Sequence, residues 1–163
     1  MFQKLFKHIS KKLMIKIDVF IKNKNWKKHI SNPKKYLKNK LKYLNNSIKF
    51  VKNKKISFSL MLGGRKEIRE LNKKFRNKNK ATDVLSFPFY TNNSLKKLKD
   101  KNIYLGDVIL NLYEINKKNF NKSFNKLWVH GFLHLLGHKH KKNKDYYKMN
   151  RLENLILKKI EDK

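Results

Sequence analysis

Four segments of the chain predict β-strands from their pattern of apolar and polar residues. In residues 13–20, Ile15, Ile17 and Val19 alternate with polar neighbours, as in a strand that buries one face. The other three segments alternate in the same way or form short apolar runs: 56–62, 84–89 and 104–110. Gly106 and Asp107 interrupt the apolar run of the last of them.

Apolar residues three or four positions apart predict helices between and after these strands. A helix that begins at Pro33 carries proline in its first turn and one apolar stripe, formed by Tyr36, Leu37, Leu41 and Leu44. Further helices are expected at 66–75, 113–120, 123–136 and 145–160, with Asp145 capping the last. The segment 91–102 is polar and predicts a loop.

Strands that alternate with helices predict an α/β or α+β fold, with a small mixed sheet of about four strands packed against helices. The length of 163 residues favours a single domain that spans residues 1–163. A chain of this size buries about two thirds of its unfolded surface, and 39% hydrophobic residues are enough for a core.

Composition excludes several classes of protein. The chain has no cysteine, so disulfides and thiolate metal ligands are absent, and any metal must rest on histidine or carboxylate. No apolar run approaches the roughly 20 residues that span a membrane. The first residues are too polar for a secretory signal, so a cytoplasmic protein is expected.

The formal net charge of +32 predicts attraction to polyanions that weakens as salt rises. Only four of the 43 basic residues are arginine, and asparagine accompanies lysine in runs such as 22–25, which indicates a coding bias toward AT-rich codons. The charge therefore supports a phosphate-bearing partner without specifying which one.

Four of the six histidines lie within eleven residues: His130, His134, His138 and His140. A spacing of four puts His130 and His134 on one helical face. Gly137 predicts a left-handed helix end, after which the chain can return His140 toward the other two. Three imidazoles with an open fourth position are typical of catalytic zinc. The alternative is a histidine tract that binds metal adventitiously or packs a helix end.

The spacing of these histidines matches a metzincin protease with one difference. Those enzymes place a glutamate base directly after the first histidine, and this chain has Gly131 there. The metal ligands are therefore predicted without the protease base, which makes a metalloprotease the weakest interpretation.

Two further segments, together with the histidine run, resemble the YbeY family of bacterial endoribonucleases. They are LNKKFR at 71–76 followed by ATDVLSFP at 81–88, and LGDVI at 105–109; the histidine run is HGFLHLLGHKH at 130–140. The motifs occur in the family's order, and the resemblance extends from about residue 56 to the C-terminus. One departure is His138-Lys139, where the family has Tyr-Asp, so a carboxylate beside the last histidine is lost.

The resemblance implies a small α/β fold with one zinc ion held by His130, His134 and His140. It implies that Arg76 serves catalysis or RNA binding. It also implies cleavage of single-stranded RNA near the 3′ end of small-subunit ribosomal RNA, a role in ribosome quality control, and the ribosome or its small-subunit precursor as partner. Neither DNA nor a membrane is expected as a partner.

The candidate catalytic residues are Arg76 and His138. Arg76 would stabilise charge on the phosphate. It is one of only four arginines in a chain whose other basic residues are lysine, which suggests that its fork geometry is needed. A surface salt bridge is the alternative for Arg76. His138 titrates in the range of a general base, or it points to solvent. Asp83 and Asp107 are candidates to orient the histidines, or to act in turns and caps.

A second function, from a different class, stays open. The lost carboxylate at Lys139 and the missing base at Gly131 also fit an RNA- or ribosome-binding assembly factor with a structural zinc. Trp26 and Trp128 are expected in the core rather than in a base-stacking surface, and His8 and His29 on the solvated surface.

Overall fold

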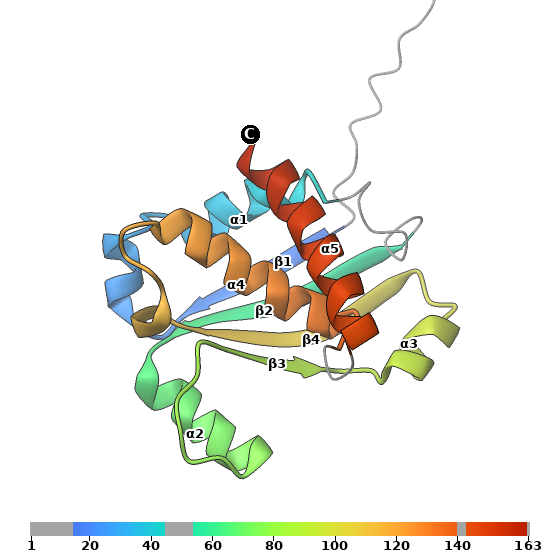
Figure 1. Cartoon of the computed structure of the whole chain (residues 1–163), viewed down its shortest axis with the longest axis horizontal. Helices are drawn as coiled ribbons and strands as arrows, with labels where there is room; N and C mark the ends of the chain where they lie inside the picture. The colour runs from blue at the N-terminus through green and yellow to red at the C-terminus, as the bar shows by residue number, and fades with distance from the viewer. Residues whose placement is uncertain (1–14, 45–53, 140–142, 163) are drawn as a thin grey trace, which may run out of the picture.

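The computed structural model describes residues 15–44, 54–139 and 143–162 (Figure 1). Its strands are β1 (Ile15–Ile21), β2 (Lys55–Gly63), β3 (Val84–Pro88) and β4 (Asn102–Asn111). Its α-helices are α1 (Pro33–Leu41), α2 (Arg65–Arg76), α3 (Asn92–Lys97), α4 (Phe120–Leu135) and α5 (Asn143–Glu161). Two short 3₁₀ helices, η1 (Lys24–Lys28) and η3 (Leu112–Glu114), complete the described elements. None of these helices combines the length and apolar character needed to cross a membrane.

The four strands form one mixed sheet in the order β1-β2-β4-β3, which confirms the predicted mixed α+β fold. β1 and β4 each run parallel to β2, whereas β3 runs antiparallel to β4 and forms one edge of the sheet. A bulge lies between β2 and β4, where Ser57 pairs with Tyr104 and Ser59 with Asp107. The extra residue in β4 places Gly106 at a φ of 126°, where a Cβ would lie 2.1 Å from the carbonyl oxygen of Phe87.

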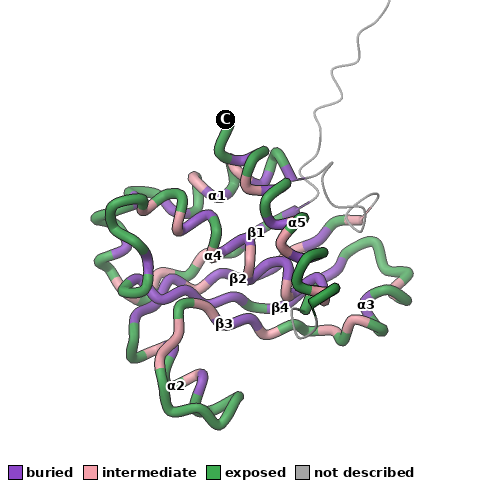
Figure 2. The backbone as a smooth tube through the Cα atoms, in the orientation of Figure 1, coloured by how far each residue is buried: buried purple, intermediate pink, exposed green. Residues whose placement is uncertain are grey.

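One face of the sheet carries most of the core. α4 and α5 cross in front of the strands in Figure 1, and Figure 2 shows that the strands beneath them are largely buried. The largest fully buried side chains share this layer: Trp26, Phe58, Phe124, Trp128 and Phe132. The indole N–H of Trp26 donates to the carbonyl of Gly63 at 2.8 Å, so the one polar atom of that ring is satisfied. Both tryptophans therefore belong to the core, as predicted.

The opposite face is covered only in part. α2 packs there through its own Ile68, which forms a small buried cluster with Leu85 of β3 and Ile109 of β4, and Figure 2 shows that most of this helix is exposed. α2 does not cover all the side chains of β1 and β2 that point to this face. Phe20 is accordingly 54% exposed although it lies within a strand.

Two sequence predictions of local structure are wrong. The segment 91–102 contains α3, because the Thr91 hydroxyl accepts from the backbone N–H of Ser94 at 3.2 Å and Leu95 is buried beneath the helix. The helix predicted at 113–120 is absent. Asn116 accepts from the N–H of Lys118 instead, a turn that competes with the helix, and α4 begins only at Phe120.

Candidate functional site

The site begins with two histidines on the half-buried side of α4. His130 and His134 lie one turn apart, and their Nε2 atoms are 3.1 Å from each other. The rings meet edge to face, with centroids 4.7 Å apart and planes at 83°. Helical spacing therefore brings the two nitrogens to one point.

Gly131 fixes the height of α4 above the sheet. A Cβ at this position would lie 2.5 Å from Cγ1 of Val108, so the helix backbone sits directly on β4. The hydroxyl of Ser86, on the edge strand β3, donates to the carbonyl of Gly131 at 3.1 Å. No side chain as large as glutamate fits at Gly131. The close packing of α4 on β4 therefore explains why this position holds glycine instead of the glutamate base of the proteases.

The outer nitrogens of both histidines face acceptors. Nδ1 of His134 donates to the backbone carbonyl of His138 at 2.8 Å, and Nδ1 of His130 lies 3.5 Å from Oε2 of Glu153. A carbonyl and a carboxylate only accept, so in the neutral rings the proton is assigned to Nδ1 and the lone pair to Nε2. Two lone pairs 3.1 Å apart repel unless a proton or a cation lies near both.

This donor set fits a zinc ion. Zinc–nitrogen bonds of about 2.0–2.1 Å at a tetrahedral angle would place two Nε2 atoms about 3.3 Å apart. The observed separation is 3.1 Å. Histidines that bind zinc donate their other ring N–H to a carbonyl or carboxylate, which matches both outer contacts.

The third predicted ligand, His140, lies outside the described residues. The parts of the chain that the structure describes accordingly contain no group of three metal-binding side chains. The predicted left-handed cap is present: Gly137 has a φ of 85°, its N–H donates to His134 at 2.9 Å, and the N–H of His138 donates to Leu133 at 3.1 Å. The chain therefore leaves the helix axis directly after the second histidine.

His138 follows this cap and is half-buried. Burial, and to a smaller extent the charge of Lys96, lower the pKa of the His138 imidazole below its usual value. The neutral ring, which is the form that can accept a proton, is favoured near neutral pH. Its neighbour Lys139 is exposed, so this position carries an ammonium group and not a carboxylate.

Glu153 is a residue of the candidate site that sequence reasoning missed. This carboxylate is 6% exposed, and its Oε1 has no hydrogen-bond partner among the residues described. It lines a cavity of about 180 Å³ between α4 and α5, together with His130. Its position among the buried residues Met149 and Ile156 of α5 was the available signal, because carboxylates rarely face a core without a partner.

The two aspartates considered as partners of the histidines bind elsewhere. A carboxylate oxygen of Asp83 accepts from the N–H of Val84 at 2.7 Å, at the start of β3. Asp107 accepts from the hydroxyl of Tyr104 at 2.7 Å. Among the other histidines, His29 is exposed and stacks on Phe120, whereas His8 lies outside the described residues.

Arg76 is the last residue of α2, directly before Asn77 at a φ of 55°. Its guanidinium donates to the carbonyl of Ser86 at 3.2 Å and lies 6.0 Å from the ring centroid of Phe87. The ion pairs formed by the described residues do not include Arg76, so the salt-bridge alternative gains no support. Ser86 contacts both Arg76 and Gly131, which joins the arginine to the histidine helix through one residue.

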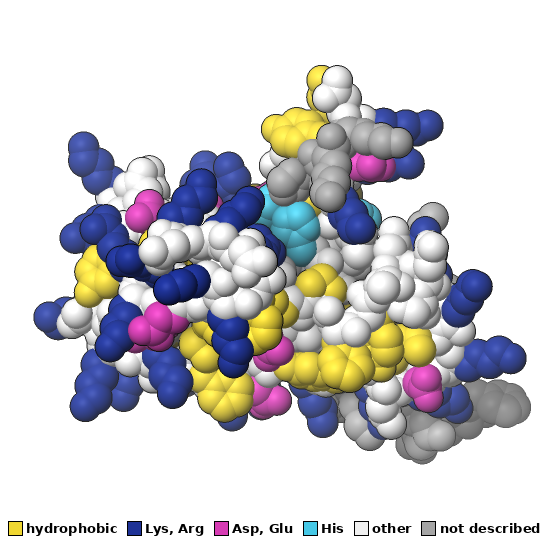
Figure 3. Space-filling view, turned by 90° about the horizontal axis from the view of Figure 1, so that it is seen from below, with side chains coloured by type: hydrophobic (Ala, Val, Ile, Leu, Met, Phe, Trp, Pro, Cys, Tyr) yellow, Lys and Arg dark blue, Asp and Glu magenta, His cyan; other side chains and the backbone are white. Residues whose placement is uncertain are grey.

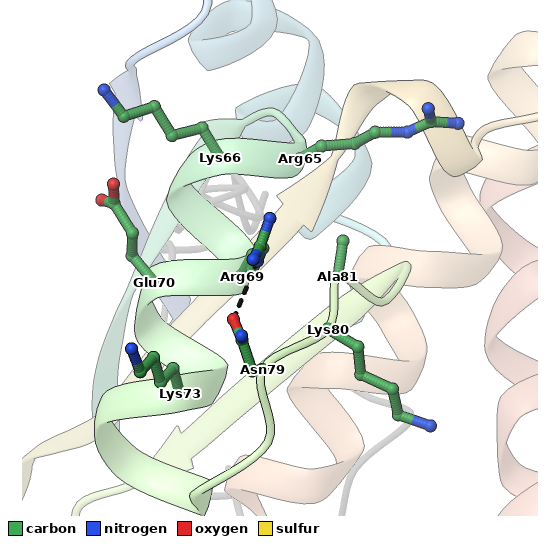
Figure 4. Close-up of a pocket in the computed structure, with 8 residues that line it drawn as sticks. All are labelled: Arg65, Lys66, Arg69, Glu70, Lys73, Asn79, Lys80 and Ala81. Atoms are coloured by element: carbon green, nitrogen blue, oxygen red, sulfur yellow. Dashed lines mark hydrogen bonds between the residues drawn. The ribbon is translucent and has the colours of Figure 1, made fainter.

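α2 also carries a strongly basic hollow of about 680 Å³ (Figure 4). Its walls come from α2 and the segment after it, with five cations and one carboxylate: Arg65, Lys66, Arg69, Lys73, Lys80 and Glu70. Arg69 donates to the side chain of Asn79 at 2.8 Å, which ties the two walls together. Three of the four arginines of the chain lie on this one helix.

Comparison with known proteins gives one family. A family model described as Endoribonuclease YbeY matches residues 20–161. Endoribonuclease YbeY of Pelagibacter ubique is 45% identical over 156 residues, which cover 92% of this chain and 99% of the relative. Endoribonuclease YbeY of Buchnera aphidicola is 44% identical over 97 residues, 56% of this chain and 59% of the relative.

A solved structure supports the fold. The solution structure of a Thermotoga maritima protein superposes with a TM-score of 0.55 at 24% identity and covers 88% of each chain. At this level of identity the likeness concerns the arrangement of strands and helices alone.

Proposed function

The chain belongs to the YbeY family of endoribonucleases, and from this premise we propose that it is a zinc-dependent enzyme that cuts single-stranded RNA in ribosome maturation. Membership makes it a nuclease that hydrolyses phosphodiester bonds of RNA. The proposed substrate is ribosomal RNA near the 3′ end of the small-subunit species. The proposed partner is the small-subunit precursor or the ribosome, with a role in ribosome quality control.

We propose that His130, His134 and His140 hold the zinc. The observation that carries this proposal is the 3.1 Å separation of the two Nε2 atoms, with each Nδ1 facing an acceptor. Glu153 would keep the His130 ring in its orientation and offset part of the positive charge. When bound, zinc would supply a Lewis acid for the phosphate and a water of lowered pKa as nucleophile.

The other residues would act on the substrate around this centre. Arg76 is held by the carbonyl of Ser86 and keeps further N–H donors for a phosphate oxygen, where negative charge grows during cleavage. His138 would take a proton, because burial favours its neutral form. The basic hollow of α2 would hold phosphates farther along the strand.

The test is cleavage of an end-labelled single-stranded RNA by proteins matched for zinc content. Replacing Arg76 by Ala should lower the rate about 10²–10³-fold, as loss of a donor to transition-state charge does. Arg76→Lys keeps the charge without the fork and should recover only part of this loss. Arg151→Ala, which removes an exposed arginine of α5, is the matched control and should cut like the wild type.

Two outcomes would contradict the enzyme proposal. If wild type and Arg76→Ala cut at the same rate, the activity belongs to a contaminating nuclease or to a different site. If neither cuts, the second function is favoured, an RNA- or ribosome-binding assembly factor in which zinc is structural. The feature that favours this second function is Lys139, which stands where the family has an aspartate.

A further inference from the structure

A groove lies on the face of the sheet that α2 covers only in part. It has a volume of about 480 Å³, within the roughly 300–1,000 Å³ of small-molecule sites. Its apolar walls come from all four strands and from α2: Phe20, Met61, Leu71, Phe75, Phe87 and Ile109. Phe20 of β1 is 54% exposed and Phe75 of α2 is 58% exposed, so two aromatic rings from separate elements line the groove and reach solvent.

This surface differs from the rest of the molecule. Charged residues make up 33% of the chain, and most of them are lysine. In Figure 3, hydrophobic side chains gather in a band below a histidine, with lysine and arginine side chains around them. An apolar groove with a few polar groups, in a highly charged protein, is a candidate binding site.

The groove is continuous with the candidate active site. The rings of Phe75 and Phe87 meet edge to face at 5.1 Å, and Arg76 lies over Phe87 at 6.0 Å. Arg76 in turn binds Ser86, whose hydroxyl holds the helix of His130 and His134 at Gly131. A chain molecule that enters the groove at Phe75 would therefore meet Arg76 next.

Polar groups stand at one side of the groove. Ser59, Tyr104 and Asp107 form a line of hydrogen bonds, with Oγ of Ser59 2.9 Å from the Tyr104 hydroxyl and that hydroxyl 2.7 Å from Asp107. Lys22 also lines the groove and adds a positive charge. Acceptors, donors and aromatic faces together match the edge and the face of a nucleobase.

We propose that this groove binds an unpaired base of the RNA substrate, stacked against Phe75 and Phe20, while the surrounding cations hold its phosphates. The inference rests on the proposed function, since it names how the same site takes its substrate. Charge decides the occupant, because a chain of net charge +32 favours a partner that is both polyanionic and able to insert flat apolar groups. Bases in a duplex are already stacked, so the groove would select single strands.

The test compares RNA with and without bases, by fluorescence anisotropy on the zinc-loaded protein. The probe is a labelled 12-nucleotide single-stranded RNA, paired with a copy that carries abasic sites at its centre; a gel after each titration checks that the RNA is intact. The variants are Phe75→Ser and Phe20→Ser. Tyr147→Ser removes a 69% exposed ring from α5 and is the matched control.

Stacking of one base predicts a loss of about five- to a hundredfold in affinity. Phe75→Ser and Phe20→Ser should show this loss on intact RNA, and Tyr147→Ser should bind like the wild type. The wild type should bind abasic RNA more weakly than intact RNA by a similar factor. Phe75→Ser should bind the two RNAs with nearly equal affinity, because the base and the ring are the two partners of one contact.

Equal binding of intact and abasic RNA by the wild type would overturn the inference. So would groove variants that bind RNA like Tyr147→Ser, which would assign the groove to an apolar protein segment instead. Binding is scored only on RNA that the gel shows to be intact, so a wild type whose binding depends on bases but which cuts no RNA in the cleavage test would refute only the proposed enzyme. A wild type that cuts RNA but binds abasic RNA equally would refute only the groove.

Discussion

The two faces of the sheet differ in how tightly their helices pack. On one face, α4 packs through fully buried aromatic side chains, and its two histidines have fixed partners for their outer nitrogens. On the other face, α2 covers a cluster of three buried residues and exposes arginine, lysine and phenylalanine. The proposed function would explain this difference, because metal ligands would need a geometry held within a fraction of an ångström, whereas contacts with a flexible single strand would tolerate mobile side chains.

The difference in packing between the two faces is tested most directly by truncating one phenylalanine on each face. Phe132 is fully buried and packs on Phe58 at 4.9 Å, so Phe132→Ala should lower the free energy of unfolding by about 3–5 kcal/mol. Phe75 is 58% exposed, and Phe75→Ala should cost less than about 1.5 kcal/mol, mostly its edge contact with Phe87. Urea unfolding measures both, and equal losses would contradict the division between a packed and an open face.

The buried carboxylate of the packed face gives the next largest effect. Glu153→Gln keeps the size of the side chain and removes its charge beside His130. We expect zinc affinity to fall about 10–100-fold, as for other residues that orient metal-binding histidines. Competition with a chromogenic chelator measures the affinity, and Glu114→Gln, whose partner is Arg65 on the far side, is the control. An unchanged zinc affinity would show that Glu153 does not contribute to zinc binding.

The smallest effect concerns the close approach of α4 to β4. Alanine normally stabilises a helix by about 0.5–1 kcal/mol relative to glycine. At Gly131 the added Cβ would meet Val108 at 2.5 Å, and we expect Gly131→Ala to be destabilising by about 1–2 kcal/mol in net. Thermal or urea unfolding tests this, with Lys148→Ala on the exposed side of α5 as reference. A stabilised variant would show that the helix has room to move.

Sequence patterns predicted the features that depend on local spacing. The distance between His130 and His134 and the left-handed cap at Gly137 follow from helix geometry alone, and both are present. The four predicted strands are present for the same reason, because alternation reports directly on which face is buried.

Features that depend on distant contacts could not be predicted in this way. The partner of Arg76 is a backbone carbonyl on β3, which carries no sequence signal at all. Glu153 reaches His130 only because α5 folds back on α4. The groove combines Phe20, Phe75 and Phe87 from three separate elements, and each of them alone looks like an ordinary core residue. The metal-binding roles of His130, His134 and His140 and the catalytic roles of Arg76 and His138 all stay predictions.

The central claim is that the histidines of α4 hold a zinc ion on which RNA cleavage depends. The most direct measurement follows zinc content and cleavage of single-stranded RNA together, in one preparation, before chelation, after it and after zinc is returned. His134→Ala is treated in parallel. We predict one zinc per chain. Removal of the zinc should lower the cleavage rate at least about a thousandfold, and return of zinc should restore it. His134→Ala should contain no zinc and cut no RNA. Cleavage at full rate by the zinc-free protein, or by His134→Ala, would contradict it.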